Sequence, residues 1–173
     1  MQLSESARVT TAHEASFRVQ YPNSKPRAVK VIALDEGSAR LIDDIAKLGW
    51  HGAAFFPSVS FDAGEAPGGP EGKSLKAWLN DLAGRTMDLV SEVAAADCVV
   101  VVATAGKDVQ STAVIAEVCA MHHKTLIALV VPDDNATDDS IDVSLRALRP
   151  FAKMLVIAHG RDYIEAMLTA LRA

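Results

Sequence analysis

The sequence is poor in cysteine and aromatic residues: it has two cysteines in 173 residues, and aromatic side chains make up 5%. Cys98 and Cys119 are too few for a disulfide framework, which fits a reducing compartment. The longest apolar runs, such as residues 98–103, are far too short to span a bilayer, and residues 1–8 lack the apolar core of a signal peptide. We therefore expect a soluble, cytoplasmic protein.

Positive charge is also scarce. Lysine and arginine number 17 against 22 aspartates and glutamates, a formal net charge of −5, and the basic residues form no cluster. This balance argues against nucleic acid or an anionic membrane as a partner. The P-loop pattern G-x-x-x-x-G-K-[ST] and the catalytic patterns G-x-S-x-G, H-E-x-x-H and C-x-x-C do not occur. No motif identifies a cofactor, and we expect no metal site.

Residues 1–27 are mostly polar and are interpreted as an N-terminal arm. Within the arm, the segment Phe17-Arg-Val-Gln-Tyr21 alternates apolar and polar side chains, which is typical of a half-buried strand. Prolines at positions 22 and 26 end this pattern. Two interpretations stay open: an added edge strand, or an arm that packs on a partner subunit.

Residues 28–173 are predicted to form a single α/β domain, because half of the whole sequence is hydrophobic and short apolar segments alternate with helical patterns. Segment 57–72 contains four glycines and three prolines, so we predict no regular structure there. It is expected to be either a lid over the ligand crevice or an ordinary surface loop. The predicted strands are 28–34, 52–56, 97–104, 125–131 and 153–158, and the predicted helices are 38–48, 73–96, 109–122, 138–148 and 161–173.

This alternation predicts a three-layer, doubly wound parallel sheet of about five strands, Rossmann-like or flavodoxin-like, in the order 2-1-3-4-5. Ligands bind such sheets beyond the carboxyl ends of the strands, at the switch point between the first and third strands. The residues predicted to lie at that edge form the candidate ligand-binding site: Asp35, Glu36, Gly37, Ser38, Thr104, Gly106, Lys107, Asp108 and His159.

The chemistry expected of these residues has alternatives. Asp35 and Glu36 either bind a cation, an amine or a ribose hydroxyl, or cap the helix that follows them. Two carboxylates at that point would repel a diphosphate. Gly106 and Lys107 precede a helix N-terminus, which favours an anion or phosphate site; the alternative is a capped turn with an exposed lysine. His159 is a candidate general base.

A resemblance adds to this interpretation. The residues Asp97-Cys-Val-Val-Val-Val-Ala-Thr-Ala-Gly106, then Val114-Ile-Ala-Glu-Val-Cys119 and Lys124-Thr-Leu-Ile-Ala-Leu-Val-Val-Pro132 resemble the middle of the bacterial tubulin-like division GTPases (FtsZ). The resemblance implies a nucleotide-type fold. The family's glycine-rich phosphate signature is represented by Lys107-Asp-Val-Gln-Ser-Thr112, which has no glycine. Only the position of Gly106 and the helix end after it are carried over, and we expect no GTP hydrolysis.

The predicted helix 109–122 is apolar around most of its circumference, which favours burial on more than one side. We expect either a second subunit, making the protein a homo-oligomer, or the N-terminal arm to cover its outer side. The function expected from the sequence is a binding domain for a small, nucleotide-type or anionic ligand. The alternatives are a small enzyme that uses Asp35 or Glu36 with His159, and a structural subunit without a ligand.

Overall fold

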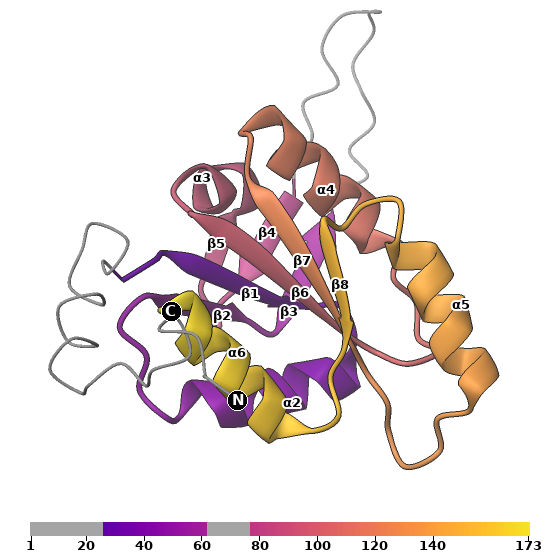
Figure 1. Cartoon of the computed structure of the whole chain (residues 1–173). Coiled ribbons are helices and arrows are strands. Elements are labelled where there is room, and N and C mark those ends of the chain that lie inside the picture. Colours follow the sequence, from indigo (N-terminus) through magenta and orange to yellow (C-terminus); the bar gives the residue numbers. More distant parts are fainter. Residues whose placement is uncertain (1–25, 62–76) are drawn as a thin grey trace, which may run out of the picture.

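The central element is a five-stranded parallel sheet in the order β2-β1-β6-β7-β8 (Figure 1). A computed structural model describes residues 26–61 and 77–173 of the chain. This order is the predicted 2-1-3-4-5, so the doubly wound fold is confirmed. The strands are β1 (Val29–Ala33), β2 (Ala53–Phe56), β6 (Cys98–Thr104), β7 (Thr125–Val131) and β8 (Met154–Ile157).

The position of each strand follows from its apolar content. All seven residues of β6 are buried, as expected for a strand covered by helices on both faces. β6 pairs with β1 on one side, from Val29 opposite Cys98, and with β7 on the other, from Cys98 opposite Thr125. β8 has a less buried sequence and forms an edge. The longest apolar strands are therefore central.

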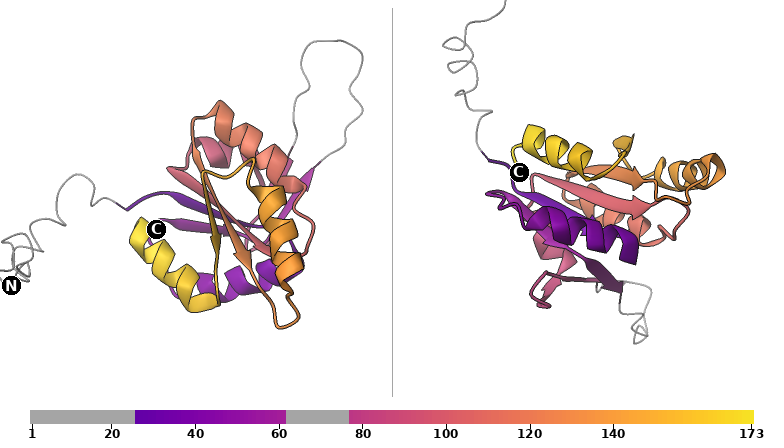
Figure 2. Two further views of the ribbon diagram at one scale, coloured as in Figure 1. Left: turned by 45° about the vertical axis from the view of Figure 1, so that its right-hand side comes forward. Right: turned by 90° about the horizontal axis from the view of Figure 1, so that it is seen from below.

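Helices cover both faces of the sheet (Figure 2). On one face, α2 (Glu36–Ala46) and α6 (Arg161–Leu171) contribute Ile42, Ile45, Ile164 and Leu168 to one apolar cluster with Val31 and its neighbours on the sheet. On the other face, α3 (Leu89–Ala94), α4 (Ser111–Met121) and α5 (Asp138–Leu148) pack on the second cluster. The molecule thus has the three predicted layers.

A small antiparallel sheet, in the order β3-β4-β5, was not predicted. Its strands are β3 (Ser58–Phe61), β4 (Ala77–Asn80) and β5 (Thr86–Asp88). The expected helix over 73–96 is therefore wrong for 77–88, and of the described residues in this segment only those of α3 form a helix. The expectation of no regular structure in 57–72 is wrong for β3. Residues 62–76, which include the rest of the suggested lid, lie outside the described residues, as does the arm up to residue 25.

The physical reason for this error is the turn between β4 and β5. A stripe of large apolar residues is compatible with a helix, but in β4 the alternate residues Ala77 and Leu79 are buried with period two. The side chain of Asp81 then accepts hydrogen bonds from the backbone N–H groups of Ala83 (2.9 Å) and Arg85 (2.8 Å). Gly84 has φ +74°, which a glycine adopts at little cost. These local interactions close a hairpin.

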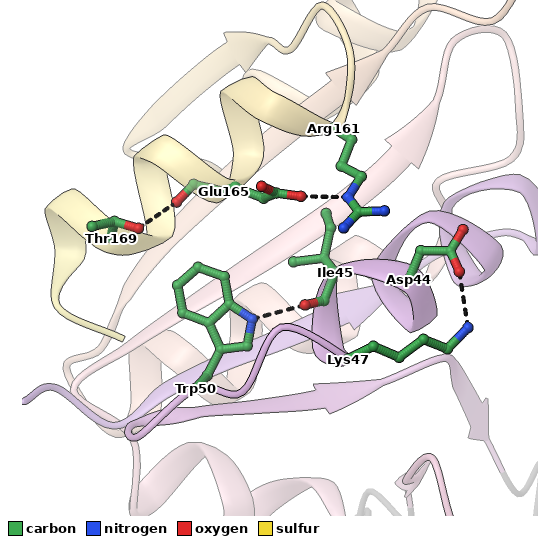
Figure 3. Close-up of polar contacts among 7 residues, drawn as sticks. All are labelled: Asp44, Ile45, Lys47, Trp50, Arg161, Glu165 and Thr169. Atoms are coloured by element: carbon green, nitrogen blue, oxygen red, sulfur yellow. Dashed lines mark hydrogen bonds and ion pairs between the residues drawn. The ribbon is translucent and has the colours of Figure 1, made fainter.

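Helices α2 and α6 lie side by side and carry local polar contacts (Figure 3). On α6, Arg161 forms an ion pair with Glu165. The Asp44 carboxylate of α2 binds the Lys47 ammonium (2.9 Å), and its negative charge contributes to raising the pKa of Arg161, after the larger effect of Glu165. The indole Nε1–H of Trp50 donates to the carbonyl of Ile45 (2.9 Å), fixing the chain after α2. The polar contacts on this face are thus local to each helix, and they lie beside the apolar cluster that α2 and α6 share with the sheet.

Helix α4 buries one side, formed by Thr112, Ile115, Val118 and Cys119. Its outer side exposes Ala113, Glu117, Ala120 and Met121, the last of which is 57% exposed. The predicted second partner for this helix, whether a subunit or the arm, stays a prediction. No helix in the described part of the chain is long and apolar enough to cross a membrane.

Candidate functional site at the carboxyl edge of the sheet

Asp35 and Thr104 lie at the carboxyl ends of β1 and β6, which are adjacent strands. The Asp35 carboxylate accepts hydrogen bonds from the backbone N–H and the hydroxyl of Thr104, each at 2.7 Å. It also accepts the N–H and the hydroxyl of Ser38, each at 3.0 Å, and Ser38 completes a capping box at the start of α2. Four donors thus surround one carboxylate.

These hydrogen bonds determine the charge of Asp35. Burial by itself would raise the pKa of Asp35, but the hydrogen bonds from Thr104 and Ser38 outweigh it and hold the pKa below its ordinary value. Asp35 is therefore ionised near neutral pH and acts only as an acceptor. Both oxygens of the Asp35 carboxylate accept hydrogen bonds from Ser38 and Thr104. Of the two roles left open by the sequence, ligand binding and helix capping, this arrangement favours helix capping.

The residues after Asp35 are also accounted for by local contacts. Glu36 is exposed and forms an ion pair with Arg40 one turn further along α2. Gly37 packs directly against Thr104: a Cβ at position 37 would lie 2.6 Å from the Thr104 Oγ1 atom. The close approach of α2 to β6 at this point thus requires glycine.

The loop after β6 is held by its neighbours. The N–H of Ala105 donates to Val131 (2.9 Å) and that of Lys107 to Thr104 (3.2 Å). The N–H of Gly106 donates to the buried hydroxyl of Ser144 on α5 (2.8 Å). Gly106 has φ +76°, and a Cβ there would lie 3.1 Å from the Ser140 Cβ atom. The loop conformation is consequently defined by β7 and α5.

The N-terminus of α4 follows this loop and has no side-chain cap. Gln110 occupies the N-cap position without a side-chain capping hydrogen bond, as does Gly160 at the start of α6, whereas the caps of α2, α3 and α5 each make one. Asp108 instead accepts the N–H of Gln110 (2.9 Å). Lys107 is exposed and makes no ion pair within the described ranges. In the first turn, the Thr112 hydroxyl is buried and has no hydrogen-bond partner among the described residues.

His159 does not join this group. It is exposed after β8, and β8 is separated from β1 by β6 and β7. Three strand spacings correspond to roughly 14 Å along the edge. The structure therefore brings Asp35, Gly37, Ser38 and Thr104 together, places the Gly106–Asp108 loop after the same strand as Thr104, and keeps His159 apart.

Sequence reasoning missed Ser144. This side chain is 1% exposed and fixes the Gly106 backbone through its hydroxyl. The available signal was its position on α5 between Ile141 and Leu148, where a polar residue interrupts the apolar stripe of the helix. Such a residue needs a partner inside the protein.

Two grooves of about 590 Å³ each lie at the outer strands of the large sheet. One follows β8 and the end of α5. The other follows β2, and we call it the β2 groove. At its base, Lys30 and Glu92 form an ion pair of 2.6 Å with both side chains 15% exposed. The β2 groove is lined by Lys30, Ala46, Gly49, Trp50, Ala53, Ala54, Phe55, Phe56, Asp81, Leu82, Ala83, Arg85, Met87 and Glu92.

The cysteines and acidic groups give no further site. Cys98 and Cys119 are buried free thiols, and burial raises the pKa of Cys119 to about 11. Among the described residues, no group of three or more histidine, cysteine, aspartate or glutamate side chains is arranged to hold a metal ion.

The fold and the edge geometry define the chain as a Rossmann-like, doubly wound parallel α/β protein. No family model matches the sequence, and no curated protein matches it. The functional conclusion therefore depends on the geometry of the carboxyl edge alone.

Proposed function

We propose that the protein binds a small anionic ligand of the nucleotide type at the loop between β6 and α4. The observation that carries the proposal is the N-terminus of α4 at the switch point of the sheet, where Gln110 makes no side-chain capping hydrogen bond. Lys107, which makes no ion pair within the described residues, lies four residues before Ser111, the first residue of α4. Helix N-termini attract anions through their free N–H groups and their dipole. A phosphate or carboxylate group would add a second acceptor there, beside the Asp108 carboxylate that accepts the N–H of Gln110.

The neighbouring carboxylates do not oppose this assignment. The ionised Asp35 carboxylate accepts hydrogen bonds from four donors, and Glu36 forms an ion pair with Arg40. These contacts offset part of the repulsion that each carboxylate exerts on an anion. The hydroxyl of Thr112 lies in the same first turn, on the buried side of α4, and has no hydrogen-bond partner among the described residues.

The other candidate functions have less support. An acid–base pair of Asp35 or Glu36 with His159 would have to act across three strand spacings. GTP hydrolysis is not proposed, since the loop between Gly106 and α4 contains no glycine to bring backbone close to a triphosphate. A structural subunit without a ligand is the remaining alternative, and the experiment below separates the two.

The test is a thermal-shift screen with inorganic phosphate, AMP, GTP, NAD and FMN at millimolar concentration. A ligand that binds the native state raises the melting temperature by mass action. We expect at least one of these anions to do so in the natural protein and in the Lys153→Ala variant, and not in Lys107→Ala. Both substitutions remove one exposed lysine, but Lys153 precedes β8 at the opposite edge. No shift with any of them, or equal shifts in both variants, would overturn the proposal.

A further inference from the structure

The edge strand β2 presents an unpaired backbone to the β2 groove. The N–H of Val29 donates to the carbonyl of Gly52 (2.9 Å), and the parallel register continues with Lys30 opposite Ala54. In a parallel ladder this pattern turns the N–H and C=O groups of Ala54 toward β1 and those of Ala53 and Phe55 away from it. Because β2 is the last strand of the sheet, these outward groups have no strand partner among the described residues.

The β2 groove has walls on both sides of this edge. Ala46 and Trp50 stand on the α2 face, where Trp50 also contacts Phe55 with ring centroids 6.3 Å apart. Leu82, Arg85 and Met87 stand on the opposite face. An open edge between two walls is the geometry that accepts an extended segment by strand addition, in which main-chain hydrogen bonds supply affinity and flanking pockets hold alternate side chains.

The chain itself carries a matching segment a few residues before its described part. Phe17–Tyr21 has the alternating pattern of a half-buried strand, and it lies outside the described residues. The described chain begins at Pro26 beside the start of β2: a Cβ on Gly52 would lie 2.3 Å from the carbonyl oxygen of Arg27. Residues 22–27 span up to about 20 Å when extended, and passing from β1 to a strand beyond β2 requires about 10 Å.

We propose that Phe17–Tyr21 adds to β2 of the same chain as a sixth, antiparallel strand that fills the β2 groove. The alternation places Phe17, Val19 and Tyr21 against the wall formed by Trp50 and Ala46. It directs Arg18 toward the opposite face of the sheet. The short tether gives the segment an effective concentration on the order of millimolar, which favours its own β2 over that of another copy. A covered edge also protects the sheet from aggregation.

The first test is residue-resolved amide hydrogen exchange on the full-length chain. Val19→Pro removes a backbone N–H and disfavours pairing, whereas Val9→Pro makes the same change in the arm outside the segment. We expect exchange at Ala53 and Phe55 to accelerate by about tenfold or more in Val19→Pro and to stay unchanged in Val9→Pro. Unchanged exchange in Val19→Pro, or equal acceleration in both variants, would remove the proposal.

A second measurement does not depend on a disruptive variant. Val19→benzoylphenylalanine, irradiated in the full-length protein, is expected to cross-link to residues 46–56 or 81–87 within a product of monomer mass. Cross-links to other regions would contradict the docking. A product of dimer mass joined at the same residues would show that the groove receives the arm of a second copy, and would contradict pairing within one chain.

Discussion

The backbone N–H and the hydroxyl of Thr104 each donate a hydrogen bond of 2.7 Å to the carboxylate of Asp35, which lies 69 residues earlier in the sequence. The contact fastens the start of α2 to the end of the central strand β6. It therefore links the two loops that flank the switch point of the sheet.

Asp35→Asn is expected to lower the free energy of unfolding by about 1–3 kcal/mol, because an amide nitrogen would face donors that now point at a carboxylate oxygen. Urea denaturation measures the effect. Glu36→Gln is the control, since its ion pair with Arg40 is on the surface and contributes roughly 0–1 kcal/mol. If both variants lose the same free energy of unfolding, the Asp35 hydrogen bonds stabilise the protein no more than the surface ion pair of Glu36 does.

The stabilising effect of Asp35 is expected to depend on pH. Its pKa in the folded state lies below the ordinary value of 3.8, so its contribution is complete above that value and is lost as the pH falls through the lower, folded pKa. The stability difference between the natural protein and Asp35→Asn should then be constant from pH 7 to about 5 and shrink below about 4. Denaturation at a series of pH values measures it. A stability difference between the two proteins that grows as the pH falls would contradict a lowered pKa for Asp35 in the folded state.

Gly37→Ala is expected to destabilise the protein in spite of the usual preference of helices for alanine, since the added Cβ would meet the Thr104 hydroxyl at 2.6 Å. The expected loss is about 1–3 kcal/mol. In a Thr104→Ala background the 2.6 Å contact is gone and the contact with the Asp35 Oδ1 atom at 3.1 Å remains, so the same substitution should cost less than in the natural protein. Thermal unfolding of the four proteins gives this double-mutant cycle. Additive effects would refute the contact.

Both thiols are expected to react slowly with Ellman's reagent in the native protein. Cys98 and Cys119 are buried, and a thiol with a pKa of about 11, as at Cys119, is thiolate in only about one molecule in 10⁴ at pH 7. Two thiols should become reactive together upon unfolding in urea. A fast native reaction of Cys119→Ser, in which only Cys98 remains, would identify Cys98 as accessible.

The parts of the fold that the sequence predicted are those in which local pattern and tertiary role agree. The continuously apolar residues 98–104 indicated a central strand, and the alternation of strands with helices indicated the order of the sheet. Residues 77–88 were assigned wrongly because Trp78 and Leu79 fit a helical stripe equally well. The preference for a strand comes from pairing with β3 and from the Asp81 turn, neither of which a stripe reveals.

The candidate site was predicted in position rather than in detail. Topology alone brought Asp35 and Thr104 to one edge, as expected from the carboxyl ends of neighbouring parallel strands. The sequence could not show that Asp35 is occupied by four donors, because those donors come partly from a strand 69 residues away. For the same reason Ser144 escaped notice: its partner, the Gly106 N–H, belongs to another loop.

The pairing of β1 with β6 has a consequence for the order of folding. The unit β6–α4–β7 is local in sequence, whereas β1 must close a loop that contains α2, β2, the small sheet and α3 before it can reach β6. Long-range parallel pairing carries a loop-closure entropy that is recovered only late. The nucleus of folding should accordingly form around β6 and β7. The Asp35–Thr104 contact should form last, when β1 and the elements that follow it pair with the sheet that the carboxyl-terminal half has already begun.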